Sequence, residues 1–349
     1  MAGAFGVVFK TVMMNILITG GAGFIGSNFV RMVLTEHPDV VVVNLDKLTY
    51  AGNLKNLQEY INHKNHKFIK GDICDGELIE RIIEDYNINA IINFAAESHV
   101  DRSIAAPKIF IETNVTGTLT LLQAVRDKQI DRFIQISTDE VYGALGPEGK
   151  FTETTPLSPN SPYSASKAAA DHLVKSFSHT WGLKCNITRC SNNYGPFQFP
   201  EKMIPLMINN ALNEKDLPVY GDGLYIRDWL YVYDHCTAVW KILTEASPGE
   251  VYNIGGCNEK TNLEVIHLIL ERLDKSESLI KHVKDRPGHD RRYAIDASKI
   301  INQLNWKPSV TFDEGINKTI DWYLHNKEWL SDVVSGEYQT YYEQMYSNR

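Results

Sequence analysis

The segment that most restricts the fold of this chain is a glycine-rich stretch near its start. Residues 15–19 are an apolar run typical of a short strand, and the sequence Gly-Gly-Ala-Gly-Phe-Ile-Gly, residues 20–26, follows at once. From residue 27 to 35 the apolar side chains recur with helical spacing. Glycines between a strand and a helix permit a tight turn, and they let a pyrophosphate approach the backbone and the helix N-terminus. This order of elements therefore predicts a Rossmann-like α/β unit that binds a dinucleotide.

The next predicted strand, residues 40–45, ends in Asp46. A carboxylate at this place can accept hydrogen bonds from the ribose hydroxyls of adenosine, and it would repel a 2′-phosphate. The neighbouring Lys47 acts in the opposite direction. On balance the pattern predicts NAD rather than NADP as the cofactor.

The alternation of strands and helices continues through the first half of the chain. We expect strands at residues 67–70, 90–94 and 132–136, and helices at 76–86 and 114–126. Strands that are apolar throughout are typical of a parallel sheet covered by helices on both faces. The fold class is therefore α/β, with a doubly wound parallel sheet whose ligands bind at the carboxyl ends of the strands.

Small and polar residues follow the predicted strands at these ends. Asp72 could bond an adenine amino group, and the alanines at 95–96 would let a cofactor lie against the backbone. Ser98, His99 and Asp101 offer polar contacts beyond them. For His99 and Asp101, hydrogen bonds within the loop are an equally good interpretation.

Four residues carry the candidate chemistry. Asp139 and Glu140 follow the strand at 132–136, and Tyr163 and Lys167 begin a helical pattern in which they share one face. An ammonium beside a phenol favours the phenolate, so the spacing predicts that Tyr163 acts as a base near neutral pH. The two carboxyl groups could supply an acid and a base if their environments separate their pKa values. A tyrosine and a lysine on a helix surface, with an ordinary acidic turn, is the alternative.

The second half of the chain loses the regular alternation after Pro196. There we expect strands at 181–188, 217–221 and 250–256, and helices at 201–213, from 227–229 to about 245, at 262–273 and from 312 to 322 and onward. These elements predict a smaller C-terminal α/β lobe, interleaved with the first domain, that binds the substrate. The predicted domains are an extension (1–13), an NAD-binding domain (14–195) with a returning segment near 229–256, and the substrate lobe (mainly 196–349).

Two arginines in this half, Arg227 and Arg286, are candidates for clamping a second pyrophosphate, because guanidinium groups match phosphate oxygens. Surface ion pairs are the alternative for both.

Composition excludes several other classes of protein. The chain has 35 basic and 43 acidic residues, a formal net charge of −8, which does not suggest a nucleic-acid binder. Its five scattered cysteines contain no C-x-x-C pair, which fits reduced thiols in a cytoplasmic protein and predicts no metal site. No apolar run approaches the ~18 residues that span a bilayer.

From about Met14 to its tail the chain resembles the extended short-chain dehydrogenase/reductases, and among them the dTDP-glucose 4,6-dehydratase family. The matching segments are residues 19–26, 45–53, 95–103, 137–143, 163–167 and 285–290. The glycine motif and the Tyr/Lys pair define only the superfamily. The triplet Thr138-Asp139-Glu140 distinguishes the dehydratases from related epimerases, which carry small or uncharged residues there.

The resemblance implies a reaction. Tyr163, held as phenolate by Lys167, would take the proton of the sugar 4-hydroxyl while hydride leaves C4 for NAD⁺, and Thr138 would hydrogen-bond the 4-oxygen. Glu140 would then remove the C5 proton, and a protonated Asp139 would give its proton to the departing 6-hydroxyl. Hydride returns to C6, so NAD is regenerated each turnover and is expected to stay tightly bound.

The resemblance also implies the residues of the two binding sites. The expected cofactor set is Gly20, Gly23, Phe24, Ile25, Gly26, Asp46, Lys47, Leu48, Thr49, Asp72, Ile73, Ala95, Ala96, Ser98, Tyr163, Lys167 and Asn193. The expected nucleotide-sugar set is Ser98, Thr138, Asn192, Lys202, Met203, Pro218, Val219, Tyr220, Arg227, Asn262, Asp285, Arg286, Pro287, Gly288 and His289.

Other functions remain open at this point. A nucleotide-sugar 4-epimerase or C4 oxidoreductase would use only Tyr163, Lys167 and NAD. A dehydratase could act on UDP- or CDP-glucose, since no motif reads the base. A non-catalytic NAD-binding regulatory protein is a third possibility. The family is commonly dimeric, so the resemblance implies a homodimer built on the helices near Asn114 and Tyr163.

Overall fold

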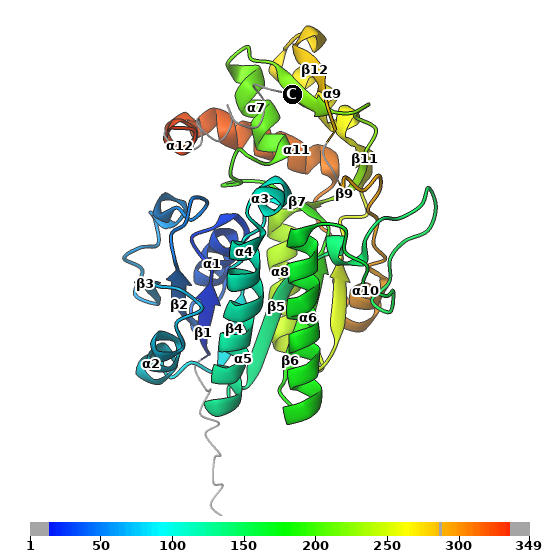
Figure 1. Ribbon diagram of the computed structural model, residues 1–349. Coiled ribbons are helices and arrows are strands. Elements are labelled where there is room, and N and C mark those ends of the chain that lie inside the picture. The colour runs from blue at the N-terminus through cyan, green and yellow to red at the C-terminus, as the bar shows by residue number, and fades with distance from the viewer. Residues whose placement is uncertain (1–13, 286–287, 336–349) are drawn as a thin grey trace, which may run out of the picture.

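The computed structural model of the protein describes residues 14–285 and 288–335. A seven-stranded sheet lies at its centre, and all neighbouring strands in it are parallel (Figure 1). The strands, in spatial order, are β10 (Val251–Ile254), β6 (Cys185–Cys190), β5 (Arg132–Thr138), β4 (Ala90–Asn93), β1 (Asn15–Thr19), β2 (Val41–Asp46) and β3 (His66–Lys70). The chain reverses its direction of sheet growth between β1 and β4, so the predicted doubly wound fold is confirmed.

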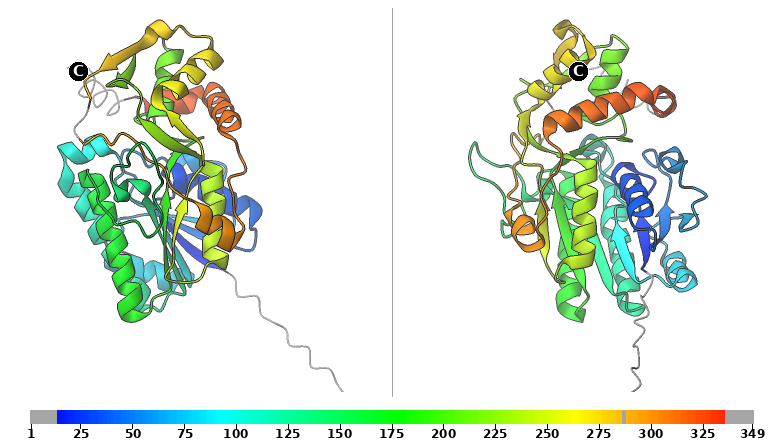
Figure 2. Two further views of the ribbon diagram at one scale, coloured as in Figure 1. Left: turned by 90° about the vertical axis from the view of Figure 1, so that its right-hand side faces the viewer. Right: turned by 180° about the vertical axis from the view of Figure 1, so that it is seen from behind.

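Helices cover both faces of this sheet, as its apolar strands require. One face packs against α1 (Phe24–Glu36), α8 (Val232–Glu245) and α10 (Ser298–Leu304), and its core includes Phe29, Val239 and Ile300. The other packs against α2 (Gly76–Tyr86), α5 (Gly117–Asp127) and α6 (Pro162–Trp181). The right view of Figure 2, seen from behind, shows α1 and α8 in front of the sheet, on the side opposite to α5 and α6.

A smaller lobe sits beyond the carboxyl ends of the sheet strands, at the top of Figure 1. Its hydrophobic core includes Ile204, Trp229 and Ile320. The lobe contains two small sheets, with strand orders β11-β9-β7 and β12-β8. Its strands are β7 (Asn192–Tyr194), β8 (Leu217–Tyr220), β9 (Ile226–Tyr231), β11 (Glu259–Thr261) and β12 (Ile280–Val283), and its helices are α7 (Met203–Leu212), α9 (Asn262–Leu273), α11 (Phe312–His325) and α12 (Lys327–Val333).

The chain passes between the lobe and the main sheet several times. After β9 it returns to the sheet as α8 and β10, and after β12 it returns again as α10. The returning strand expected near residues 250–256 is confirmed as β10, which pairs in parallel with β6. The domain boundaries themselves stay a prediction, and the expected extension at 1–13 lies outside the described residues.

Several expected elements differ from the structure. The strand expected at 181–188 begins only at Cys185, because Trp181 is the last residue of α6 and Gly182, at φ +68°, ends that helix. Residues 227–229 lie within β9, not in a lead into a helix. The helix expected at 114–126 starts earlier, with α4 (Pro107–Phe110) and the π-helical η2 (Ile111–Thr116) before α5. The sequence analysis did not predict α3 (Val100–Ala105), α10, β7, β11 or β12.

A fully buried ion pair ties α6 to the sheet. Nε of Arg189, on β6, donates to Oδ2 of Asp171 on α6 at 2.9 Å, and both side chains are 0% exposed. Nη1 of Arg189 also donates to the hydroxyl of Tyr142 at 3.0 Å, and that hydroxyl donates to Asn253 at 2.7 Å. Because Tyr142 ends the short helix η3 (Asp139–Tyr142), the pair joins α6, β6, β10 and η3.

We expect Asp171→Ala to lower the free energy of unfolding by about 3–5 kcal/mol, because Arg189 would remain buried without its counter-ion. Urea unfolding followed by circular dichroism measures the change. The control is Glu245→Ala, which breaks an exposed pair with Lys241 and should change stability by about 0.5 kcal/mol or less. Equal effects of the two substitutions would contradict the role of the buried pair.

Candidate active site

The glycine turn between β1 and α1 is shaped by close backbone contacts. Gly20 has φ +71°, and a Cβ on it would lie 2.6 Å from the backbone nitrogen of Ala95. A Cβ on Gly26 would lie 2.3 Å from the carbonyl oxygen of Gly20. At the start of α1, Gly23 is the N-cap, and no side-chain capping hydrogen bond is present there among the described residues. These glycines therefore leave room, and free donors, for the pyrophosphate of a dinucleotide.

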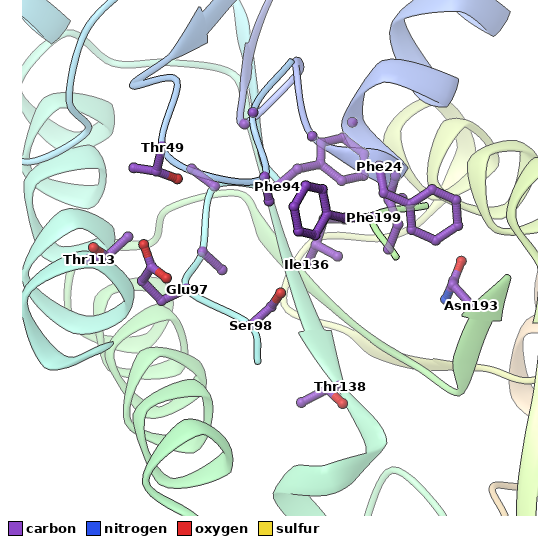
Figure 3. Close-up of a pocket in the computed structure, with 18 of the residues that line it drawn as sticks. Phe24, Thr49, Phe94, Glu97, Ser98, Thr113, Ile136, Thr138, Asn193 and Phe199 are labelled. Atoms are coloured by element: carbon purple, nitrogen blue, oxygen red, sulfur yellow. The ribbon is translucent and has the colours of Figure 1, made fainter. Parts of the chain in front are cut away.

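A long pocket runs from this turn along the carboxyl ends of β1, β2, β4 and β5 (Figure 3). Phe24 and Phe199 lie on one side of it, Thr49, Glu97 and Thr113 on the other, and Thr138 near its floor. All of the predicted cofactor residues line the pocket except Leu48, whose backbone N–H donates to Asp46 at 2.8 Å. The residues chosen for NAD thus surround one cavity.

Asp46 and Lys47 have different partners in this pocket. The Asp46 carboxylate accepts from the backbone nitrogens of Ala22 and Leu48, at 2.9 and 2.8 Å. Burial raises its pKa, and these two hydrogen bonds oppose that shift. Lys47 forms an ion pair with Asp72 at 2.6 Å, so its charge already has a protein partner. This pairing removes the main objection to NAD as the preferred cofactor.

The five predicted catalytic residues line the same pocket. Thr138 is the last residue of β5, Asp139 and Glu140 begin η3, and Tyr163 and Lys167 lie one turn apart on α6. The Lys167 ammonium donates to the carbonyl oxygen of Ile136, on β5, at 2.6 Å. Strand β5 and helix α6 therefore bring together residues that are more than twenty positions apart in the sequence.

A second pocket lies next to the first, between the sheet and the smaller lobe. Four residues, Glu140, Asn192, Glu201 and Lys202, line both. The predicted nucleotide-sugar residues in the second pocket are Asn192, Lys202, Met203, Pro218, Val219, Tyr220, Arg227, Asn262 and His289. Ser98 and Thr138 line the first pocket instead. The two cavities therefore adjoin at Glu140, the candidate base, next to Asp139, the candidate acid.

Some predicted nucleotide-sugar residues lie elsewhere. Asp285 and Gly288 line neither pocket, although Oδ1 of Asp285 is 2.7 Å from Nδ1 of His289, which does. Arg286 and Pro287 lie outside the described residues.

Comparison with known proteins agrees with this geometry. A family model described as GDP-mannose 4,6 dehydratase matches residues 17–319. A dTDP-glucose 4,6-dehydratase from Xanthomonas campestris pv. campestris (strain B100) is 54% identical over 341 residues, covering 93% of this chain and 97% of that protein. The crystal structure of a dTDP-glucose 4,6-dehydratase from Bacillus anthracis str. Ames, in complex with NAD, is 52% identical. It covers 92% of this chain and 99% of its own, with a TM-score of 0.87. The crystal structure of a dTDP-glucose 4,6-dehydratase from Streptomyces venezuelae is 48% identical. It covers 90% of this chain and 98% of its own, with a TM-score of 0.88.

The chain belongs to the dTDP-glucose 4,6-dehydratase family. The sequence resemblance predicts Asp139 as the acid, and its surroundings suit that role. Asp139 is 2% exposed, and burial, followed by the charges of Glu140 and Asp228, raises its pKa well above the usual range. Its Oδ2 has no hydrogen-bond partner among the described residues. A neutral carboxyl group with an unsatisfied oxygen can give a proton to a leaving hydroxyl.

The surroundings of Tyr163 act against the expected phenolate. Burial, followed by the charge of Glu140, raises the pKa of its phenol well above the ordinary value, and Lys167 is not among the main causes. Burial also lowers the pKa of Lys167 to about 8. Burial of the phenol therefore opposes the phenolate that Lys167 is expected to favour, and the role of Tyr163 as a base stays a prediction. A further positive charge in the pocket would favour the phenolate.

Arg227 lies in the second pocket as predicted, and it is not a surface ion pair. It is 5% exposed, and its guanidinium donates to the carbonyl oxygens of Ile226 and Asp290 at 2.7 and 2.9 Å. Tyr293 lies below it, with the ring centroid 4.5 Å from the guanidinium carbon. Such contacts orient a guanidinium group, as the clamping of a pyrophosphate requires.

The sequence did not single out several residues that line the first pocket, among them Phe94, Glu97, Thr113, Phe199 and Glu201. Thr113 comes from the π-helical segment η2, and Phe199 and Glu201 come from the loop between β7 and α7. No local motif marks them, because only the packing of the lobe against the sheet brings them to the pocket. Phe94 and Glu97 flank the predicted alanines at 95–96. A prediction that included the neighbours of these alanines would have found both residues.

Asp139 should make the protein less stable as the pH rises. Its pKa is higher in the folded protein than in the unfolded chain, so between the two values only the folded state keeps the proton, and stability falls with pH. Asp139→Asn is neutral at every pH and should gain about 1–3 kcal/mol of unfolding free energy relative to the parent as the pH rises from about 5 to about 8. Urea unfolding at both pH values measures this. Asp85→Asn, at an exposed site on α2, is the control and should show no such gain. A pH-independent difference for Asp139→Asn would contradict the assignment of a neutral Asp139.

Proposed function

We propose that the protein is a dTDP-glucose 4,6-dehydratase, which converts dTDP-glucose to dTDP-4-keto-6-deoxyglucose and water with NAD that is regenerated in each turnover. The observation that carries this conclusion is the buried Asp139, whose pKa burial raises well above its usual range, beside Glu140 in the same pocket as Tyr163. The relatives and solved structures described above bear the same enzyme name.

The residues of the first pocket fit NAD. The glycine turn leaves room for the pyrophosphate, Asp46 faces the place of a ribose, and Phe24 and Phe199 offer apolar surfaces. When bound, NAD⁺ accepts a hydride from the sugar C4, returns it to C6 and adds a positive charge to the pocket. That charge favours the Tyr163 phenolate, which burial opposes in the protein alone.

The remaining steps are proton transfers by residues of the chain. Tyr163 takes the proton of the 4-hydroxyl, and Thr138 hydrogen-bonds the 4-oxygen. The ketone at C4 acidifies the C5 hydrogen, which Glu140 removes as general base. Asp139 gives its proton to the 6-hydroxyl, which leaves as water. The two neighbouring carboxyl groups thus have opposite tasks. Burial favours the protonated form of Asp139, whereas Glu140 lies where the two pockets meet.

A nucleotide-sugar 4-epimerase would not need this pair. Epimerisation at C4 breaks no C–O bond, so a protonated Asp139 would have no leaving group to assist. Holding an unsatisfied carboxyl group in the pocket costs stability, and only elimination gives it a task. The geometry of the acid therefore favours the dehydratase, in agreement with the names of the relatives.

We also propose that the protein is a homodimer that works in the cytoplasm. Ile109 and Ile111 are 36% and 50% exposed on the helical segment before α5, and Trp181 is 48% exposed at the end of α6. Large apolar side chains at these places support an interface built on the expected helices.

None of the helices between residues 14 and 335 that the structure describes is long and apolar enough to cross a membrane.

Incubation of the purified protein with dTDP-glucose, without added NAD, tests the proposed function. We expect a product lighter by one water, detected by mass spectrometry, together with the absorbance of 4-keto sugars in alkali and no net NADH. Unchanged mass with conversion to the galactose isomer would establish the epimerase instead. Parallel reactions with UDP- and CDP-glucose should be slower, and a preference for either would overturn the choice of base.

Three substitutions separate the proposed roles. Tyr163→Phe should lower the oxidation of C4, seen as absorbance at 340 nm in a single turnover, by about 10²–10⁴-fold. Glu140→Gln and Asp139→Asn should retain this first half-reaction and lose most of the elimination of water. An equal loss of the first half-reaction in all three variants would contradict the assignment.

A further inference from the structure

The walls of the first pocket are joined by a contact that the reaction itself does not use. One wall is the loop after β2, where Thr49, Ala51 and Gly52 line the pocket. The facing wall is the segment 198–202 before α7. Between these walls the hydroxyl of Tyr50 donates to Oε1 of Glu201 at 2.9 Å.

Arg102, from α3, completes this contact. Its Nε donates to Oε2 of Glu201 at 2.9 Å, and its guanidinium carbon lies 3.7 Å from the centroid of the Tyr50 ring. Phe199 packs edge-on against the same ring, with centroids 5.7 Å apart. We call Tyr50, Arg102 and Glu201 the clasp. They come from three separate segments of the chain.

The clasp is strong for a contact between loops. The side chain of Glu201 is only 2% exposed, and both of its oxygens accept hydrogen bonds, one from a cation. Charge-assisted hydrogen bonds in a dry site are among the stronger polar interactions in proteins, and the cation over the aromatic ring adds to them. Burial, together with the Glu201 charge, raises the pKa of Tyr50, so its hydroxyl remains a donor.

The position of Glu201 also links the two pockets. Glu201 and Lys202 line both cavities, and Met203, the first residue of α7, lines the second. Lys202 in turn donates to the carbonyl oxygen of Ser98, in the loop between β4 and α3, at 3.0 Å. A ligand in the second pocket therefore contacts the segment that carries one half of the clasp.

We propose that the clasp retains the dinucleotide between turnovers and that its opening is coupled to occupancy of the nucleotide-sugar pocket. This inference rests on the proposed function, in which return of the hydride to the sugar regenerates NAD⁺ in every cycle, so the cofactor has no need to leave. Release of NAD requires the loop at 47–52 and the segment 198–202 to separate, which breaks the Tyr50–Glu201 hydrogen bond. A nucleotide that orders the segment 198–203 disfavours this opening, and by linkage bound NAD strengthens binding of the nucleotide equally.

The rate of NAD release tests the clasp. Holoenzyme freed of excess NAD is mixed with an excess of alcohol dehydrogenase and ethanol, which convert released NAD to NADH with absorbance at 340 nm. Tyr50→Phe keeps the ring and loses only the hydroxyl, and we expect it to release NAD about tenfold faster or more. Glu201→Gln, which keeps a side-chain oxygen for the hydroxyl but loses the charge beside Arg102, should also release it faster.

The matched control is Tyr60→Phe. This substitution also removes a tyrosine hydroxyl, here one that lies 2.9 Å from Thr35, away from both pockets. It should leave the release rate unchanged. Unchanged release from Tyr50→Phe and Glu201→Gln, or an equal effect of Tyr60→Phe, would overturn the clasp.

A second arm uses dTDP alone as the probe of the nucleotide-sugar pocket. Saturating dTDP should slow NAD release from the parent protein several-fold and have a much smaller effect on Glu201→Gln. Equal slowing in both proteins would overturn the coupling. Neither arm depends on turnover, so failure of the dehydratase assay and failure of the clasp are distinguishable.

Discussion

A parallel sheet directs the carboxyl ends of all its strands to one edge, and the chemistry of this protein depends on that constraint. The glycine turn follows β1, Asp46 ends β2, the alanines at 95–96 follow β4, and Thr138 ends β5. Because the strands run side by side in the order β5-β4-β1-β2, these residues face one elongated pocket. The smaller lobe covers the same edge, and the cavity between the lobe and the sheet adjoins this pocket at Glu140.

Burial at this junction explains the division of tasks among the ionisable groups. Removal from water raises the pKa of Asp139 and of Tyr163 and lowers that of Lys167. The raised pKa of Asp139 favours a protonated carboxyl group. The raised pKa of Tyr163 opposes the formation of a phenolate. A cation that shares the pocket would oppose this effect of burial on Tyr163. The buried Asp171–Arg189 pair connects Tyr142, and hence the turn that carries Asp139 and Glu140, to α6.

Much of this arrangement could be predicted from the sequence, because apolar strands and glycine turns act locally. The strand 15–19 and the helices 76–86 and 262–273 were predicted with the bounds that the structure shows. Trp181 was misassigned because an aromatic residue before an apolar run suggests a strand, and only the left-handed Gly182 marks the end of α6. The contributions of Phe199 and Glu201 depend on how the lobe packs against the sheet, which no local pattern encodes. The pKa of Tyr163 depends likewise on burial that a spacing of four residues does not report.

The interleaved path of the chain gives the enclosed site a physical basis. A lobe attached by one linker could swing away from the sheet, but here β9, β11 and α11 are each connected to elements that pack on the sheet face. Local opening is therefore the simpler motion, and the loop at 47–52 and the segment 198–202 are two of the parts of the pocket wall that connect regular elements without belonging to them. A contact between these two segments is thus the efficient place to control access to the dinucleotide. The clasp joins these two segments. Of its three residues, Glu201 also lines the nucleotide-sugar pocket.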